Sequence, residues 1–124
     1  MDKDMFLTTA EEKLAAIIWR EAPLTSPELV TYALQELDWK KSTTYTVLRK
    51  LCEKEIFRNE SAKISARLTR DELISRQSQV YVEDTFGGSL PKFIASFWGG
   101  KKLTSKEAEE LVSLIKEHGG SDNG

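Results

Sequence analysis

The order of the predicted elements most constrains the fold of this chain, because three short helical patterns lead directly into two strand-like runs. The first helix is predicted to begin at Thr8 or Thr9, each of which precedes a glutamate by three residues, the spacing of a capping box. Pro23 ends it. The second helix is predicted to begin with Ser26 as N-cap and Pro27 in its first turn. Its expected apolar stripe is Leu29, Val30, Ala33, Leu34 and Leu37.

A third helix is predicted to start near Ser42 or Thr43 and to run to about Lys54. Its expected apolar face is Val47, Leu48 and Leu51, with Thr44 on the same side.

Two strand-like runs follow at residues 56–60 and 64–68, and a short strand at residues 24–25 would complete a small sheet. Three short helices followed by a hairpin form the winged helix-turn-helix arrangement. The expected fold class is therefore mostly α with a small β-hairpin.

Three further helices are predicted after the hairpin. Thr69 caps the fourth, which ends before the glycines at 87–88, and Ser89 begins the fifth, which is closed by the glycines at 99–100. The sixth begins at the capping box of Thr104 and also carries Leu103. We expect residues 1–70 to form a winged-helix DNA-binding domain, residues 71–118 a helical dimerisation domain and residues 119–124 a disordered tail.

Charge is concentrated in the middle of this acidic chain, whose formal net charge is −2. Residues 38–70 hold nine Lys or Arg against four Asp or Glu, a net of +5, whereas the segments before and after carry −4 and −3. A cluster of cations is what a surface needs to neutralise phosphates and release their counterions. The segment from 38 to 70 is therefore predicted to meet DNA.

The outward face of the third helix supplies hydroxyl groups and cations. With Val47, Leu48 and Leu51 toward the core, the positions at Ser42, Thr46, Arg49 and Glu53 point away. In the wing, an ordinary charged hairpin is an open alternative to phosphate contact by Arg58, Lys63 and Arg67. The predicted DNA-binding residues are Lys40, Lys41, Ser42, Thr43, Tyr45, Thr46, Arg49, Lys50, Lys63 and Arg67.

Enzymatic chemistry has no support in the sequence, which shows no phosphate-binding glycine loop and no cluster of metal ligands. We expect no cofactor. The single histidine, His118, is read as a cation in the last turn of a helix, and Cys52 as a small core residue. One cysteine, no apolar run of membrane-spanning length and no signal peptide predict a cytoplasmic protein without membrane insertion.

Three ordered blocks of sequence resemble the penicillinase-repressor family of winged-helix transcriptional regulators, the BlaI, MecI and CopY type. The first block runs from Leu7-Thr8-Thr9-Ala10-Glu11-Glu12 to Ile18-Trp19. The second runs from Trp39-Lys40-Lys41-Ser42 to Leu51, and the third from Leu103-Thr104 to Glu110-Leu111. Together they extend the resemblance over nearly the whole chain.

The resemblance implies a homodimeric repressor on a palindromic, double-stranded DNA operator, controlling β-lactam resistance or a related stress response. It also implies inactivation by proteolysis in the C-terminal domain, triggered through a membrane sensor-protease. The cleaved pair of the penicillinase members, an Asn and a Phe, corresponds to Ser96-Phe97, so the Asn is replaced. The paired cysteines of copper-sensing members are not present.

Apolar side chains in the last three predicted helices exceed what those helices can bury among themselves, which independently favours dimerisation. Folding back onto the winged domain is the alternative for this apolar surface. For the whole protein, the alternative function is a winged-helix protein-interaction module without sequence-specific DNA binding. The predicted dimerisation residues are Phe86, Leu90, Phe93, Ile94, Phe97, Trp98, Leu111, Leu114 and Ile115.

Overall fold

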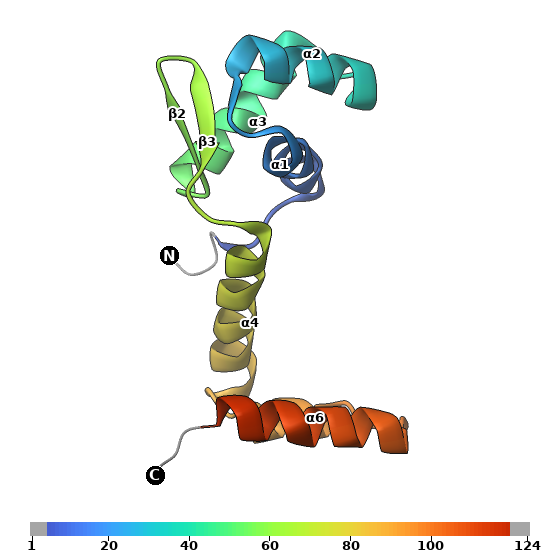
Figure 1. Ribbon diagram of the computed structural model, residues 1–124. Coiled ribbons are helices and arrows are strands. Elements are labelled where there is room, and N and C mark those ends of the chain that lie inside the picture. Colours follow the sequence, from blue (N-terminus) through green and yellow to red (C-terminus); the bar gives the residue numbers. More distant parts are fainter. Residues whose placement is uncertain (1–4, 120–124) are drawn as a thin grey trace. The chain divides into compact units, whose positions relative to one another are not determined.

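The computed structural model of the protein describes residues 5–119. Over this range it contains six helices and a three-stranded antiparallel sheet (Figure 1), which confirms the predicted fold class. The chain divides into two compact units that meet between Tyr81 and Val82, inside the fourth helix. The predicted domain boundary after residue 70 concerns independently folding parts of the chain and stays a prediction.

Helix α1 (Thr9–Glu21) starts from a complete capping box. The Thr8 hydroxyl accepts a hydrogen bond from the Glu11 backbone N–H at 3.1 Å, and the Glu11 carboxylate accepts one from the Thr8 N–H at 2.9 Å. After the short strand β1 (Leu24–Thr25), α2 (Ser26–Leu37) begins in the same way.

The prediction that Ser26 is the N-cap of α2 is wrong. Thr25 occupies that position, because its side chain and that of Glu28 form the reciprocal capping box. Ser26 is instead a buried residue inside the first turn. The sequence Thr25-x-x-Glu28 carried the correct start, one residue earlier.

Helix α3 (Lys41–Glu53) begins slightly before the predicted position, after Lys40, which makes no side-chain capping bond. Its buried residues are Thr44, Val47, Leu48 and Leu51, so the predicted inward face is confirmed.

Strands β2 (Phe57–Glu60) and β3 (Lys63–Ala66) form the hairpin, and β3 lies between β2 and β1 in the sheet. Their register pairs Glu60 with Lys63 at the tip. The two turn residues, Ser61 and Ala62, both have positive φ angles, 52° and 66°. Two successive left-handed residues suit the twist of a two-residue hairpin, so the turn is one residue tighter than predicted. At the other end of the hairpin, the strands stop short of the predicted residues 56, 67 and 68.

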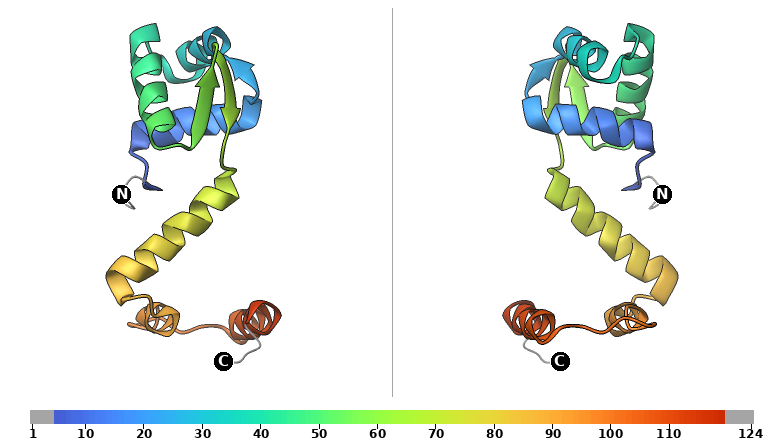
Figure 2. Two further views of the ribbon diagram at one scale, coloured as in Figure 1. Left: turned by 90° about the vertical axis from the view of Figure 1, so that its left-hand side faces the viewer. Right: turned by 90° about the vertical axis from the view of Figure 1, so that its right-hand side faces the viewer.

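The core of the first unit lies among α1, α2, α3 and the hairpin, as Figure 2 shows. Phe57 of β2 is buried and packs against Trp19 with the rings tilted by 56° and their centroids 5.2 Å apart. The Trp19 indole N–H donates to the Leu68 carbonyl at 2.8 Å. The predicted apolar stripe of α2 is wrong at Leu34, which is 57% exposed. Because α2 buries only a narrow face, Ala33 reaches the core and its neighbour does not.

Helix α4 (Arg70–Phe86) starts from the predicted cap at Thr69, which forms a reciprocal capping box with Glu72. Leu73 is its buried residue. The Arg70 guanidinium lies 5.0 Å from the centroid of the Trp19 ring, in cation–π contact.

The second unit contains α5 (Leu90–Ser96) and α6 (Ser105–His118), capped by Ser89 and by the Thr104–Glu107 box respectively. The fifth helix is shorter than predicted, so Phe97 is its C-cap and Trp98 lies beyond it. Leu103 precedes the N-cap of α6 and is not part of the helix. Of the predicted tail, residues 120–124 lie outside the described residues.

Candidate nucleic-acid interface

The outward face of α3 presents the side chains that the sequence predicted for DNA. Between Lys41 and Lys50, the exposed residues are those at the predicted contact positions, while the buried residues between them anchor the helix. The helix periodicity therefore places hydroxyls and cations on one surface. The exposed members of this face are Lys41, Ser42, Thr43, Thr46, Arg49 and Lys50.

Tyr45 differs from these neighbours because it is only partly exposed and packs against the core. Its hydroxyl lies 3.4 Å from the Ser26 hydroxyl oxygen, at the long end of hydrogen-bonding distance. Ser26 in turn donates its backbone N–H to the Ala62 carbonyl at 2.8 Å. Tyr45 therefore lies beside the start of α2, with the tip of the hairpin bonded to the same serine.

Seven of the nine cations of the basic segment fall into two groups. Within residues 5–119, the ammonium groups of Lys40, Lys41, Lys50 and Lys63 make no ion pair. Three arginines have carboxylate neighbours at the upper limit of ion-pair distance: Arg49 with Glu53 at 3.9 Å, Arg58 with Glu60 at 3.8 Å and Arg67 with Glu55 at 3.8 Å. These exposed pairs are weak and can yield to phosphate.

Two cations counted in the +5 segment serve the fold instead. Lys54 donates to a Glu11 carboxylate oxygen at 2.7 Å and to the Phe6 carbonyl at 3.0 Å, and its side chain is 18% exposed. Arg70 covers the Trp19 ring. The positive surface available to a polyanion is therefore smaller than the sequence count indicates.

The hairpin separates its two predicted contacts. Lys63 begins β3 next to the tip, close to Thr25 at the start of α2. Arg67 follows β3 at the base, where its guanidinium faces Glu55 just after α3. The structure therefore groups Lys63 with the tip and Arg67 with the far end of α3.

Sequence reasoning missed Asn59. A hollow of about 380 Å³ lies between α3 and β2, and Asn59 lines it together with Thr46, Arg49 and three further residues, Tyr45, Leu48 and Cys52. The strand alternation that buries Phe57 also turns Asn59 toward α3, so the period-2 pattern could have identified it.

Burial raises the pKa of the Cys52 thiol, and the negative charge of Glu53 adds to the effect.

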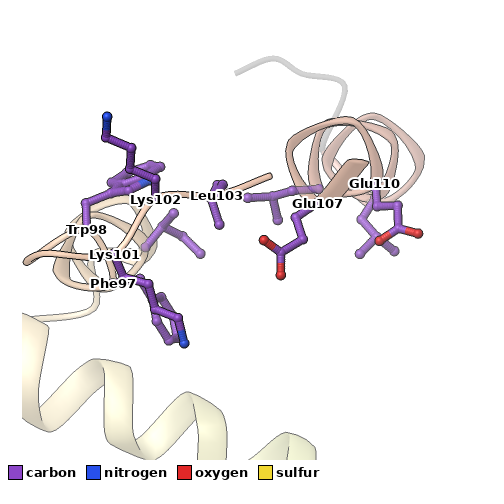
Figure 3. Close-up of a pocket in the computed structure, with 10 residues that line it drawn as sticks. Phe97, Trp98, Lys101, Lys102, Leu103, Glu107 and Glu110 are labelled. Carbon is purple, nitrogen blue, oxygen red and sulfur yellow. The ribbon is translucent and has the colours of Figure 1, made fainter. Parts of the chain in front are cut away.

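The second unit has an apolar hollow of about 410 Å³ between α5 and α6. Figure 3 shows Phe97 and Trp98 on one side with Lys101 and Lys102, and Glu107 and Glu110 of α6 on the other. α5 and α6 contain no buried residue over their described length. A surface this apolar is typical of a protein interface.

Residues 5–119 contain no group of three or more His, Cys, Asp or Glu side chains placed to hold a metal ion. Among the same residues, no helix combines the length and apolar character needed to cross a bilayer.

The fold is a winged helix-turn-helix, and the exposed face of α3 carries hydroxyl groups and cations. The sequence model of the penicillinase repressor family matches residues 7–117, and the chain belongs to that family. It is similar to the penicillinase repressor of Bacillus licheniformis, with 20% identity over 122 residues and 95% of each chain covered. The predicted family resemblance is thus confirmed, and the family supports a role in DNA-binding transcriptional repression rather than catalysis.

Proposed function

We propose that the protein acts as a homodimeric repressor on a palindromic, double-stranded operator, with α3 of each copy in a major groove. The observation that carries this proposal is the division of α3 into a buried apolar face and an exposed face of hydroxyls and cations. A recognition helix needs both faces. Two half-sites lie about 34–36 Å apart, one helical turn, when two such helices read the same side of a duplex.

Side chains on α3 divide naturally between base edges and phosphates. Arg49 can present two N–H groups to guanine, and Thr46, one turn earlier, can contact a base edge or a thymine methyl. Lys41 and Lys50 of α3, and Lys63 of β3, make no ion pair within residues 5–119 and are point charges suited to phosphate oxygens. Asn59, across the hollow from Arg49, joins this set as an amide that both donates and accepts.

Dimerisation is the proposed role of the second unit. Phe97, Leu114 and Ile115 are each more than half exposed, so α5 and α6 leave them uncovered within the second unit. A second copy can cover them, because a two-fold axis presents the same apolar surface twice. Lysines on one side of the hollow and glutamates on the other make such a surface complementary to itself in charge.

Proteolytic control at Ser96-Phe97 is part of the proposal. This bond joins the last residue of α5 to its C-cap, and both side chains are exposed. A membrane sensor-protease pathway would trigger the cleavage. The repressor would act in the cytoplasm, on genes for β-lactam resistance or a related stress response. Cutting there would separate α6 from the rest of the dimerisation surface.

The decisive experiment selects DNA from a random duplex pool with the full-length protein and then measures binding against salt concentration. We expect a two-fold symmetric site and a log–log salt slope of about −0.9 for each phosphate contact. Failure to select any sequence, together with a flat salt response, would favour the protein-interaction module instead.

The Arg49→Ala variant tests the proposed DNA contacts of the exposed face of α3. If Arg49 contacts a base, affinity for the selected site falls by about 1–3 kcal/mol and selectivity relaxes at one position. Arg76→Ala is the matched control, because Arg76 is an exposed arginine on α4 and belongs to neither α3 nor the hairpin. Equal weakening on all sequences would make Arg49 a phosphate contact.

A further inference from the structure

The N-terminal segment ahead of α1 bonds to two helices that lie far apart in the sequence. The Gln77 side-chain amide of α4 donates to the Met5 carbonyl at 2.7 Å. The Lys54 ammonium, at the end of α3, donates to the Phe6 carbonyl at 3.0 Å. Adjacent carbonyls of one short segment therefore connect the end of the recognition helix with α4.

This segment is itself well anchored in the first unit. Met5 packs against the hydrophobic core, and the same Lys54 ammonium pairs with the buried carboxylate of Glu11. Because Glu11 also closes the capping box of α1, the segment is held on both sides of Phe6.

The first turn of α4 is fixed independently, by the burial of Leu73 and by the contact of Arg70 with Trp19. Gln77 lies one turn further along, where the helix is leaving the core. A hydrogen bond there resists tilting of α4 about its anchored first turn. The described residues thus hold α4 at two successive turns.

Small tilts at this position have large effects further along. From Leu73 to the end of α4 at Phe86 the helix is about 20 Å long. A tilt of about 10° moves the far end by about 3.5 Å, close to the rise of one base pair. The contacts that fix the direction of α4 therefore control how narrow a range of half-site spacings a dimer accepts.

We propose that Gln77 is a positioning residue that, through Met5, Phe6 and Lys54, sets the half-site spacing the dimer accepts. The inference rests on the proposed dimeric repressor. Gln77 makes no contact with DNA in this scheme, and it acts by coupling α4 to the recognition helix.

The test uses full-length Gln77→Glu, which keeps the size of the side chain and removes the N–H donor. Gln79→Glu is the matched control, because Gln79 is an exposed residue of the same helix whose amide donates to Ser75 within α4. The probes are the duplex selected by the wild-type protein, derivatives with one or two base pairs inserted or removed at its dyad, and an isolated half-site.

Wild-type protein and Gln79→Glu should lose about tenfold or more in affinity when the spacing changes by two base pairs. Gln77→Glu should show a flattened or displaced spacing optimum, with at least about a threefold smaller penalty. Its affinity for the half-site and its melting temperature should match those of Gln79→Glu. Gln77→Met, which removes the donor without adding a charge, should reproduce the altered spacing profile.

The two proposals fail in different ways. A spacing profile of Gln77→Glu and Gln77→Met identical to that of the wild-type protein overturns the positioning role alone. No spacing preference in the wild-type protein overturns the dimeric repressor and this inference with it.

Discussion

Lys54→Met should destabilise the protein without altering its electrostatic attraction to DNA. Lys54 belongs to the basic segment, but its ammonium group is 2.7 Å from Glu11 and 3.0 Å from the Phe6 carbonyl. The Lys54 and Glu11 side chains are 18% and 5% exposed. The substitution removes both bonds and leaves the Glu11 carboxylate buried without its counter-charge.

The magnitude follows from the burial of the pair. Removing one partner of a fully buried ion pair costs about 3–5 kcal/mol, and a lost hydrogen bond costs about 1 kcal/mol. Glu11 keeps the hydrogen bond from the Thr8 N–H, and the Lys54 side chain is partly hydrated. We therefore expect the free energy of unfolding at pH 7 to fall by about 2–4 kcal/mol.

Acid should reduce this difference. Burial acts to raise the pKa of Glu11, but hydrogen bonds from Lys54 and Thr8 and the charge of Lys54 outweigh it, so the pKa lies below its ordinary value of 4.5. A lowered carboxyl pKa stabilises the folded state above pH 4.5, and this stabilisation is lost as the pH falls through the folded-state pKa. In Lys54→Met only the hydrogen bonds with Thr8 remain to offset the effect of burial on the Glu11 pKa, so the wild-type advantage should shrink between pH 7 and pH 3.

Urea denaturation followed by tryptophan fluorescence measures these free energies, at one protein concentration because a dimer is expected. Glu53→Gln is the control. Glu53 and its partner Arg49 are both exposed, so the free energy of unfolding should change by less than about 1 kcal/mol. In DNA titrations, Lys50→Met should reduce the salt slope by about 0.9, and Lys54→Met should leave it unchanged. A stable Lys54→Met protein with a reduced slope would refute the assignment of Lys54 to the fold.

Three other changes test the core, the hairpin turn and the proposed interface. Phe57→Ala should lower the free energy of unfolding by about 3–5 kcal/mol in urea denaturation, because Phe57 is buried against Trp19, and a loss below about 1 kcal/mol would contradict that packing. Ala62→Gly should raise it by about 0.5–1 kcal/mol by relieving the left-handed conformation at φ 66°, whereas a loss of stability would show that the turn is not strained. Leu114→Asp should give a monomer in sedimentation with operator affinity reduced at least about tenfold, and a persistent dimer would exclude this surface.

The sequence predicted most helix starts because threonine and glutamate three residues apart satisfy backbone N–H groups locally. Thr8, Thr69 and Thr104 all cap the helices expected of them. The same rule, applied at Ser26 instead of Thr25, misplaced one cap by a residue. Local hydrogen bonding is visible in sequence, and the error came from choosing between adjacent candidates.

Other features depend on surroundings that a sequence pattern does not contain. Charge counting cannot tell that Lys54 turns inward to Glu11, and helical spacing cannot tell that α2 leaves Leu34 exposed. The end of α5 also escaped prediction. There the Ser96 hydroxyl donates to the Phe93 carbonyl at 2.6 Å, competing with the continuing helix, and the chain leaves α5 before Phe97.

The sequence was enough to predict which residues of α3 face outward, but not how α3 and β2 combine into one surface. Periodicity identified the outward residues of α3, since Val47, Leu48 and Leu51 fix its inward side. The hollow beside Asn59 exists only because β2 passes next to α3, and that contact follows from the tertiary fold.

Reciprocal side-chain caps secure the starts of four helices, α1, α2, α4 and α6, whereas the caps shown at the other ends of α1, α2 and α6 are made by backbone N–H groups. Unwinding should therefore have a direction, advancing from the carboxyl end of each helix toward its threonine. Amide deuterium uptake should follow this polarity, fastest in the last turn and slowest just behind the cap. For α6, which has no buried residue in the single chain, this capping box is the main local barrier to complete melting until the proposed dimer forms.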